Sequence, residues 1–305
     1  MTVVRRSLQQ TADYGQQTTD NNHGQRTTDN GPRTNYGQLA LWAFHVALLT
    51  GVILSFHYRP WGDVFKSVSK ISGWLPYGDF LRKLHYLAGQ CFLILSFAHV
   101  LEHFLKETYR RIRPKEWSRL VLLFSLGFPL LFTGFILKGD KEGILAGEVM
   151  YHLAQEIPLI GSGLARMLLR PGEEFFLLPY LYHTVILPLT VIFLLDRHTR
   201  RLLPRGDWGW PFMAFLALLA TFFPLPPDIP PYMEISHISG PWFFHGVQLL
   251  LRQVPPLWAG VIWPVIPLLL TALLPFAPPK LSKWGKRLTM AAWLIHGMIL
   301  VAAWL

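Results

Sequence analysis

Long apolar stretches separated by short polar loops dominate the chain after residue 37. An α-helix rises 1.5 Å per residue, so most of these stretches could cross a hydrocarbon layer about 30 Å thick. Their length and low charge predict membrane helices. The seven predicted spans are residues 38–58, 80–105, 118–138, 175–197, 209–224, 256–276 and 287–305. The pattern therefore predicts an all-α integral membrane protein.

Residues 1–37 have a different pattern. They are polar and repetitive, and TTDN occurs at residues 18–21 and again at residues 27–30. Such a segment has too few apolar side chains to build a core. It also lacks the apolar stretch of a secretory signal. We expect a flexible polar extension here.

Composition and charge agree with a membrane protein. The chain is 51% hydrophobic, and its single cysteine, Cys91, excludes a disulfide framework and a c-type haem attachment motif. The net charge of +10 does not indicate nucleic acid, because the basic residues gather in alternate loops, after the second, fourth and sixth spans. This asymmetry predicts a cytoplasmic N-terminus. We also expect contact with membrane lipid, in an inner (cytoplasmic) membrane of bacterial type.

Four histidines lie at matched positions in two of the spans. His85 and His99 are fourteen residues apart, which is close to four helical turns and about 21 Å of rise. His183 and His198 are fifteen residues apart, so they share a helix face within about 60°. Gly89, between the first two, is small enough to let a large group approach.

Two helices with paired histidines at equal depths can hold two flat macrocycles. A low-spin haem takes two axial ligands, and neutral imidazole is a suitable one. A lone membrane histidine is more often a hydrogen-bonded packing residue, but ionisable groups there are costly and four at matched spacing favour function. We expect His85 with His183 at an outer haem b and His99 with His198 at an inner one. His103, one turn beyond His99, is a competing inner ligand.

Several motifs resemble a known family. They include TGVILSFHYRP at residues 50–60 and IPLIGS at residues 157–162. From Gly37 to the end of the sixth span the chain resembles the cytochrome b subunit of quinol–cytochrome c oxidoreductases, the cytochrome bc family. The seven spans are closest to the chloroplast-type branch, but in one chain. The resemblance implies a dihaem four-helix bundle over residues 38–205, followed by three further transmembrane helices over residues 206–305.

The same resemblance implies residues around the two haems. Arg82 matches the arginine that meets a haem propionate, and Gly37, Gly51 and Gly134 match three of four glycines against which the haems pack. Glycine lets a porphyrin approach the helix backbone, although close helix packing also uses glycine. The fourth family glycine falls on Leu120, so the inner haem is expected to pack differently.

The quinone chemistry departs from the family. The family's Pro-Glu-Trp-Tyr motif falls on residues 240–243, where proline replaces the proton-accepting glutamate and phenylalanine replaces the tyrosine. Another base must then accept the quinol proton. Glu234 and His237, upstream in the same loop, are candidates, although both also fit a solvated loop. Lys138 places a charge where the family has proline. The candidate quinone-site residues are Glu234, His237, Trp242 and Phe243.

Two functions fit these features. The first is a dihaem b subunit that moves electrons across the bilayer between the quinone pool and a redox partner. It would work with iron–sulfur or cytochrome c subunits, with quinone as substrate, in a complex that could be a homodimer. The alternative is a dihaem anchor that links a peripheral oxidoreductase or multihaem cytochrome c to quinone without bifurcation. A structural or transport protein would contain no haem.

Overall fold

The computed structural model describes residues 36–199, 203–204, 208–234, 240–278 and 280–305. Within these ranges the chain forms helices and loops and no strand. The α-helices are α2 (Tyr36–Ser55), α3 (Val64–Trp74), α4 (Gly78–Leu105), α5 (Pro114–Ile136), α6 (Lys141–Gln155), α7 (Gly161–Leu168), α8 (Leu177–Leu181), α9 (Leu187–Thr199), α10 (Gly209–Phe222), α11 (His245–Leu251), α12 (Trp263–Leu273) and α13 (Ser282–Ala302). Short 3-10 or π segments are η1 (Thr108–Arg110), η2 (Tyr182–Ile186), η3 (Trp242–Phe244), η4 (Leu257–Ile262) and η5 (Leu274–Phe276).

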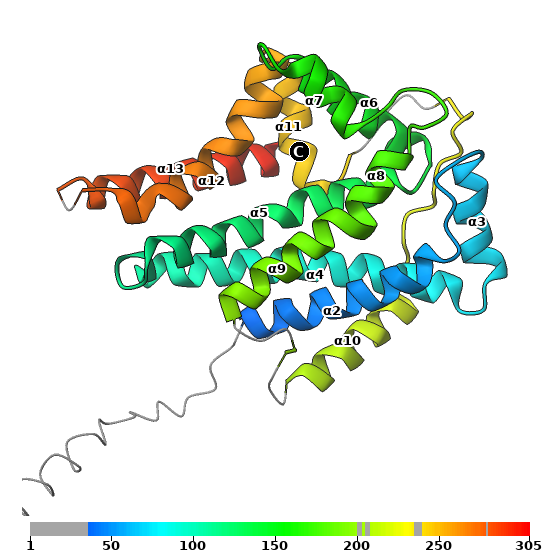
Figure 1. Ribbon diagram of the computed structural model, residues 1–305, viewed down its shortest axis with the longest axis horizontal. Helices are drawn as coiled ribbons and strands as arrows, with labels where there is room; N and C mark the ends of the chain where they lie inside the picture. Colours follow the sequence, from blue (N-terminus) through cyan, green and yellow to red (C-terminus); the bar gives the residue numbers. More distant parts are fainter. Residues whose placement is uncertain (1–35, 200–202, 205–207, 235–239, 279) are drawn as a thin grey trace, which may run out of the picture. The chain divides into compact units, whose positions relative to one another are not determined.

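A four-helix bundle is formed by α2, α4, α5 and the continuous helix α8–η2–α9 (Figure 1). Helix α2 packs along α4, α4 packs on α5, and α5 packs on α9, while η2 contacts α2 and closes the ring. Apolar side chains from all four helices fill the interior. The buried members of this cluster are Ala40, Ala43, Phe44, Phe92, Leu123, Leu130 and Val191.

Five helices of the described chain are long and apolar enough to cross a membrane. They are Tyr36–Ser55, Gly78–Leu105, Pro114–Ile136, Leu177–His198 and Leu257–Phe276, which correspond to the first four and the sixth predicted spans. At the fifth predicted span, α10 has only 14 residues. At the seventh, α13 begins with a basic turn and is not among the five. The chain is an all-α integral membrane protein.

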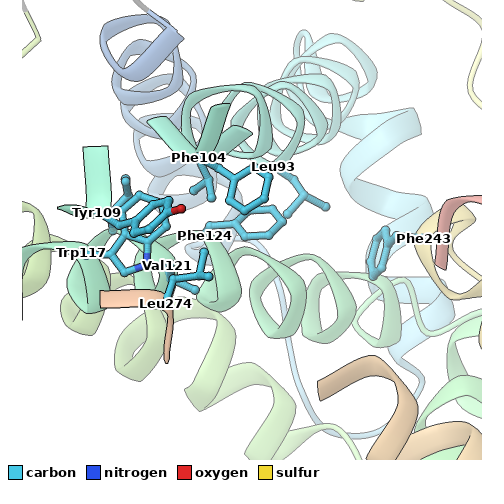
Figure 2. Packing of buried hydrophobic residues seen from close by; sticks show 10 residues of the cluster. Leu93, Phe104, Tyr109, Trp117, Val121, Phe124, Phe243 and Leu274 are labelled. Atoms are coloured by element: carbon cyan, nitrogen blue, oxygen red, sulfur yellow. The ribbon is translucent and has the colours of Figure 1, made fainter. Parts of the chain in front are cut away.

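A second apolar cluster joins the bundle to the C-terminal helices (Figure 2). It includes Trp117 on α5, which is fully buried and donates from Nε1 to the Thr271 carbonyl of α12 at 2.7 Å. Trp293 of α13 donates to the Thr271 hydroxyl at 2.9 Å. Because an unsatisfied buried indole would be costly, these two bonds fix α12 and α13 against α5.

Two connections at one end of the bundle carry short helices. Helix α3 buries Val64, Val68 and Ile71 on one face, and Asp63 caps it by accepting from the Lys66 amide. Helices α6 and α7 form a hairpin whose turn contains the predicted Ile157–Ser162 motif. Asp140 caps α6 by accepting from the Gly143 amide at 2.8 Å.

Candidate functional site

The four matched histidines lie in two pairs inside the bundle. The ring centroids of His85 and His183 are 5.9 Å apart, and those of His99 and His198 are 6.5 Å apart. Helix α4 supplies one histidine to each pair, and the α8–η2–α9 helix supplies the other. The pairs are thus separated by about 21 Å of rise along α4. The predicted pairing is what the structure brings together.

A π turn explains how unequal spacings give matched pairs. His183 lies in the π segment η2, where the Leu187 amide donates to the Tyr182 carbonyl five residues earlier. A π turn contains one residue more than an α turn. The fifteen-residue spacing in this helix therefore acts like the fourteen-residue spacing in α4. The extra rotation of about 100° that one more residue makes in a regular helix is thus absorbed before His198.

Backbone carbonyls orient both rings of the His85–His183 pair. Nδ1 of His85 lies 2.9 Å from the Ala47 carbonyl, and Nδ1 of His183 lies 2.9 Å from the Leu130 carbonyl. A carbonyl only accepts, so each Nδ1 carries the proton and each Nε2 keeps a free lone pair. That tautomer is the one in which Nε2 can bind a metal.

The same local sequence holds each of these two rings. Four residues after each accepting carbonyl stands a glycine, Gly51 on α2 and Gly134 on α5. A Cβ at Gly51 would lie 2.9 Å from Cε1 of His85, and one at Gly134 would lie 2.7 Å from Cε1 of His183. The preceding residue in each case is a threonine, whose Oγ1 lies 3.2 Å or 3.3 Å from the histidine Nδ1. In this structure the glycines thus accommodate the imidazoles themselves.

Fewer contacts position the two rings of the His99–His198 pair. Gly37 takes up the His99 ring, since a Cβ at this glycine would lie 2.9 Å from Cε1 of His99, but Leu120 stands at the fourth family position. Nδ1 of both histidines is buried and has no hydrogen-bond partner among the described residues. His103 packs edge-on against His99 with centroids 4.6 Å apart, and its Nδ1 lies 3.1 Å from Thr108 Oγ1.

The spacing of both pairs fits one metal between two imidazoles. A metal–imidazole bond is about 2 Å long and the ring centroid lies about 1 Å behind the nitrogen, so two such rings on opposite sides of one metal have centroids about 6 Å apart. In the described ranges no three His, Cys, Asp or Glu side chains form a metal-binding group. Two ligands per site is the number that a haem iron takes, so the residues present fit haem.

Two other predicted haem residues, Gly89 and Arg82, do not contact a histidine ring of either pair. A Cβ at Gly89 would meet only Leu131 Cδ1, at the ordinary distance of 3.8 Å. Gly89 is therefore not part of a tight cradle. Arg82, expected to face a propionate, donates from Nη2 to Asp228 Oδ2 at 2.8 Å and from Nη1 to the Ser72 hydroxyl.

The predicted quinone-site residues are only partly brought together. Trp242 donates from Nε1 to Gln90 Oε1 of α4 at 2.7 Å, and the ring of its neighbour Phe243 packs edge-on against Phe128 of α5. Glu234 is exposed and has no hydrogen bond or ion pair within the described chain. His237 lies outside the described residues.

Sequence reasoning missed the threonines and the π turn. The signal for the first is a repeat, since LLTG at residues 48–51 and LFTG at residues 131–134 occur in the first and third spans. The signal for the second is Pro188, whose missing amide cannot pair with the Thr184 carbonyl. The other π segment, η4, is likewise followed by Pro264.

Comparisons with known proteins agree with this arrangement. The family model described as cytochrome b/b6/petB matches residues 32–203. Cytochrome b6 of Heliomicrobium gestii is 30% identical over 166 residues, which cover 53% of this chain and 78% of that protein. The menaquinol:cytochrome c reductase cytochrome b subunit of Geobacillus thermodenitrificans is 25% identical and is covered to 80%, over 57% of this chain.

A solved structure extends the likeness beyond the four-helix bundle. A chain of a hyperthermophilic respiratory Complex III has a TM-score of 0.67 at 18% identity, covering 88% of this chain and 91% of its own length. At that identity the likeness concerns the fold. The family model covers more than half of the chain, including all four paired histidines. The protein therefore belongs to the cytochrome b/b6 family, the haem-containing, electron-carrying membrane subunits of cytochrome bc complexes.

Proposed function

We propose that the chain is a dihaem cytochrome b that moves electrons across the membrane between the quinone pool and a redox partner. The observation that carries the proposal is the two histidine pairs in one bundle, with centroids 5.9 Å and 6.5 Å apart. One haem b would be held by His85 and His183, the other by His99 and His198. Bound haem supplies one-electron chemistry at each pair.

The chain's own residues orient these ligands. The carbonyls of Ala47 and Leu130 hold the Nδ1 protons of His85 and His183, which keeps each Nε2 basic and aimed away from the helix that carries the carbonyl. The histidine pairs lie within the bundle, whose interior carries a cluster of apolar side chains from all four helices. Such burial is one means by which a protein tunes a haem.

Partners must supply the remaining redox centres. The chain has one cysteine and no CxxCH motif, so it has too few thiolates for an iron–sulfur cluster and no c-type haem attachment motif. We place it in a complex with iron–sulfur or cytochrome c subunits, which could be homodimeric, in a bacterial-type inner membrane with the N-terminus on the cytoplasmic side. Residues 38–205 would form the dihaem domain and residues 206–305 a three-helix domain.

A second candidate is a dihaem anchor that passes electrons to or from quinone without bifurcation. Its support is the segment that aligns with Pro-Glu-Trp-Tyr. There Pro241 replaces the glutamate, and the side chain of the upstream Glu234 is exposed. Trp242 and Phe243 would line the quinone pocket in either case.

Spectroscopy of the complex in membranes tests the proposal. We expect two b-type haems with bis-imidazole absorption bands, both reduced by added quinol. His183→Ala should remove one haem and His198→Ala the other. With the second quinone site inhibited, added oxidant should raise haem reduction transiently if the complex bifurcates, and should not if the chain is an anchor. A wild-type complex without b-type haem would overturn both candidates.

A further inference from the structure

Arg82 is held by two other side chains in this structure. Its Nη2 donates to Asp228 Oδ2 at 2.8 Å, and its Nη1 donates to the Ser72 hydroxyl. The first partner lies in the loop after α10 and the second on α3, so the guanidinium joins three separate parts of the chain. The guanidinium has five N–H donors, and these two contacts use two of them.

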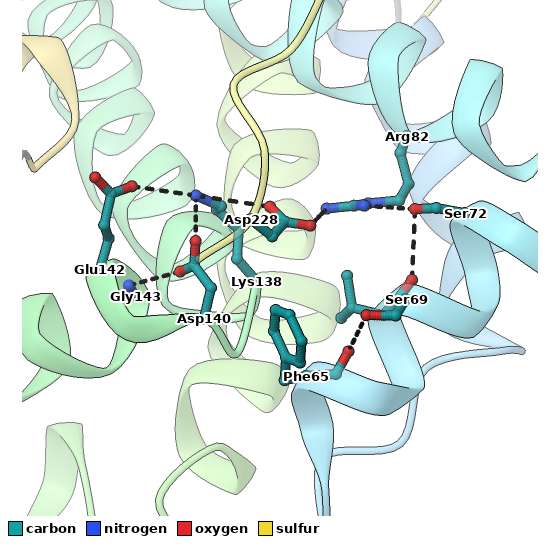
Figure 3. Close-up of polar contacts among 10 residues, drawn as sticks. Phe65, Ser69, Ser72, Arg82, Lys138, Asp140, Glu142, Gly143 and Asp228 are labelled. Carbon is teal, nitrogen blue, oxygen red and sulfur yellow. Dashed lines mark hydrogen bonds and ion pairs between the residues drawn. The ribbon is translucent and has the colours of Figure 1, made fainter. Parts of the chain in front are cut away.

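Asp228 belongs to a larger ionic network, which we call the Lys138 cluster (Figure 3). Lys138 Nζ lies 2.7 Å from Asp140 Oδ2, 3.4 Å from Glu142 Oε2 and 3.7 Å from Asp228 Oδ1. Figure 3 shows the ammonium group between the three carboxylates, with Arg82 on the far side of Asp228. The cluster consists of Arg82, Lys138, Asp140, Glu142 and Asp228.

The cluster is shielded from water and has one carboxylate in excess. Asp140 is fully buried, and the other four side chains are 18% to 23% exposed. Lys138 lies beyond the membrane-length part of α5. Burial alone would lower the pKa of Lys138, but the charges of Asp140, Asp228 and Glu142 outweigh it and raise the pKa. Lys138 is therefore a fixed positive charge at neutral pH.

The backbone places this cluster next to the His85–His183 pair. Arg82 is three residues before His85 on α4, and Lys138 is four residues after Gly134, which touches the His183 ring. Each separation is about one helical turn, or 5 to 6 Å of rise. The His99–His198 pair lies about 21 Å further along α4. Charges in the cluster therefore act mainly on one of the two pairs.

We propose that Asp228 and Lys138 set, with opposite signs, the reduction potential of the haem at the His85–His183 pair. This inference rests on the proposed dihaem function. Reduction adds one electron to that site. A nearby carboxylate opposes the added negative charge and lowers the potential, whereas a nearby ammonium raises it.

The expected size follows from distance and screening. A unit charge about 10 Å from the reacting centre, at an effective dielectric constant of about 20, changes a one-electron equilibrium constant about tenfold. Tenfold corresponds to 59 mV for one electron. An exposed charge further away is largely screened at physiological ionic strength, so surface variants provide controls.

Redox titration of the haems in the membrane-bound complex tests the inference. Asp228→Asn should raise the reduction potential of the haem that is lost in His183→Ala. The equilibrium constant for its one-electron reduction should rise about tenfold. Lys138→Gln should lower the same potential by a similar factor, and the second haem should move little in either variant. Exposed residues supply the charge-matched controls: Glu148→Gln for the carboxylate and Lys70→Gln for the ammonium.

Two further variants keep the inference testable if Asp228→Asn fails to assemble. If Asp228→Asn does not assemble, Glu142→Gln removes a carboxylate with a weaker, 3.4 Å contact to Lys138 and should still raise the potential. Asp228→Glu should keep the wild-type value. Unchanged potentials, or shifts of the same sign in Asp228→Asn and Lys138→Gln, would overturn the inference and leave the dihaem function standing. Absence of two b-type haems in the wild type would overturn the function itself.

Discussion

The two histidine pairs differ in how far the chain orients them before any cofactor binds. At the His85–His183 pair, each Nδ1 has a backbone carbonyl at 2.9 Å and each ring has a glycine beneath it. At the His99–His198 pair, only one ring has a glycine, and neither Nδ1 has a partner within the described chain. One site is preorganised by α2 and α5, while the other depends more on what occupies it.

The repeated Thr-Gly pairs account for the difference. Each places a small residue one turn after an accepting carbonyl, so a ring from a neighbouring helix can reach that carbonyl. At the fourth family position on α5 stands Leu120 in place of a glycine. Arg33, four residues before Gly37, lies outside the described residues. Preorganisation here is thus a property of two particular turns and not of the bundle as a whole.

The largest expected effect concerns the identity of the inner ligand. His99→Ala should remove one of two b-type haems, because His99 faces His198 with centroids 6.5 Å apart. His103→Ala should retain both, because its Nδ1 lies 3.1 Å from Thr108 Oγ1 and its ring packs on His99 from the side. Haem content by pyridine haemochrome assay checks both. If His103→Ala lost a haem and His99→Ala kept both, His103 and not His99 would be the ligand opposite His198.

Glycine-to-alanine substitutions should distinguish glycines that contact a histidine ring from glycines in ordinary helix packing. Gly134→Ala puts a methyl group 2.7 Å from Cε1 of His183, so the ring must move and the haem at that pair should be lost or become high-spin. Alanine favours a helix over glycine by about 0.5–1 kcal/mol, so helix destabilisation would not explain the loss. Optical and EPR spectra of the membranes provide the measurement.

Gly89→Ala is the matched control for this change. Its methyl group would meet only Leu131 Cδ1 at 3.8 Å, and both haems should keep wild-type spectra. Gly37→Ala should affect the other haem, since its Cβ would lie 2.9 Å from Cε1 of His99. Normal low-spin spectra in Gly134→Ala would show that the glycine is not needed to seat the ring.

Removing the hydroxyl of Thr50 or Thr133 should have a smaller effect on the haem at the His85–His183 pair. Each accepts weakly from a histidine Nδ1 that is already held by a carbonyl, so Thr133→Val removes only the secondary interaction. We expect both haems to remain and the equilibrium constant for reduction at the His85–His183 pair to change by less than about tenfold. Redox titration measures this, with Thr190→Val on α9 as control. An equal shift at both haems would argue against a local role.

The sequence predicted the parts of this site that depend on one helix at a time. Spacing placed two histidines on one face of each of the second and fourth spans, because residues on one helix keep fixed relative positions. The basic loops then set His85 and His183 at one side and His99 and His198 at the other. The structure brings those pairs together. The first four spans were also recognisable from length and hydropathy.

What could not be predicted depends on contacts between distant segments. Asp228 reaches Arg82 across 146 residues of sequence, and no periodicity relates the two. Gly51 and Gly134 were identified as cradles for a porphyrin, whereas the structure places imidazole rings against them. The role of Thr50 and Thr133 likewise becomes visible only when α2 faces α4 and α5 faces η2.

The smallest expected effect is an absence of pH dependence in the contribution of Lys138. Its pKa is raised above the ordinary value because the attraction of Asp140, Asp228 and Glu142 outweighs burial. Lys138 should then stay protonated, and its charge constant, between about pH 6 and pH 9. The difference in potential between wild type and Lys138→Gln should therefore be the same at both ends of that range, at the His85–His183 haem only. A difference that shrinks towards pH 9 would mean that Lys138 loses its proton there, and that burial outweighs the three carboxylates.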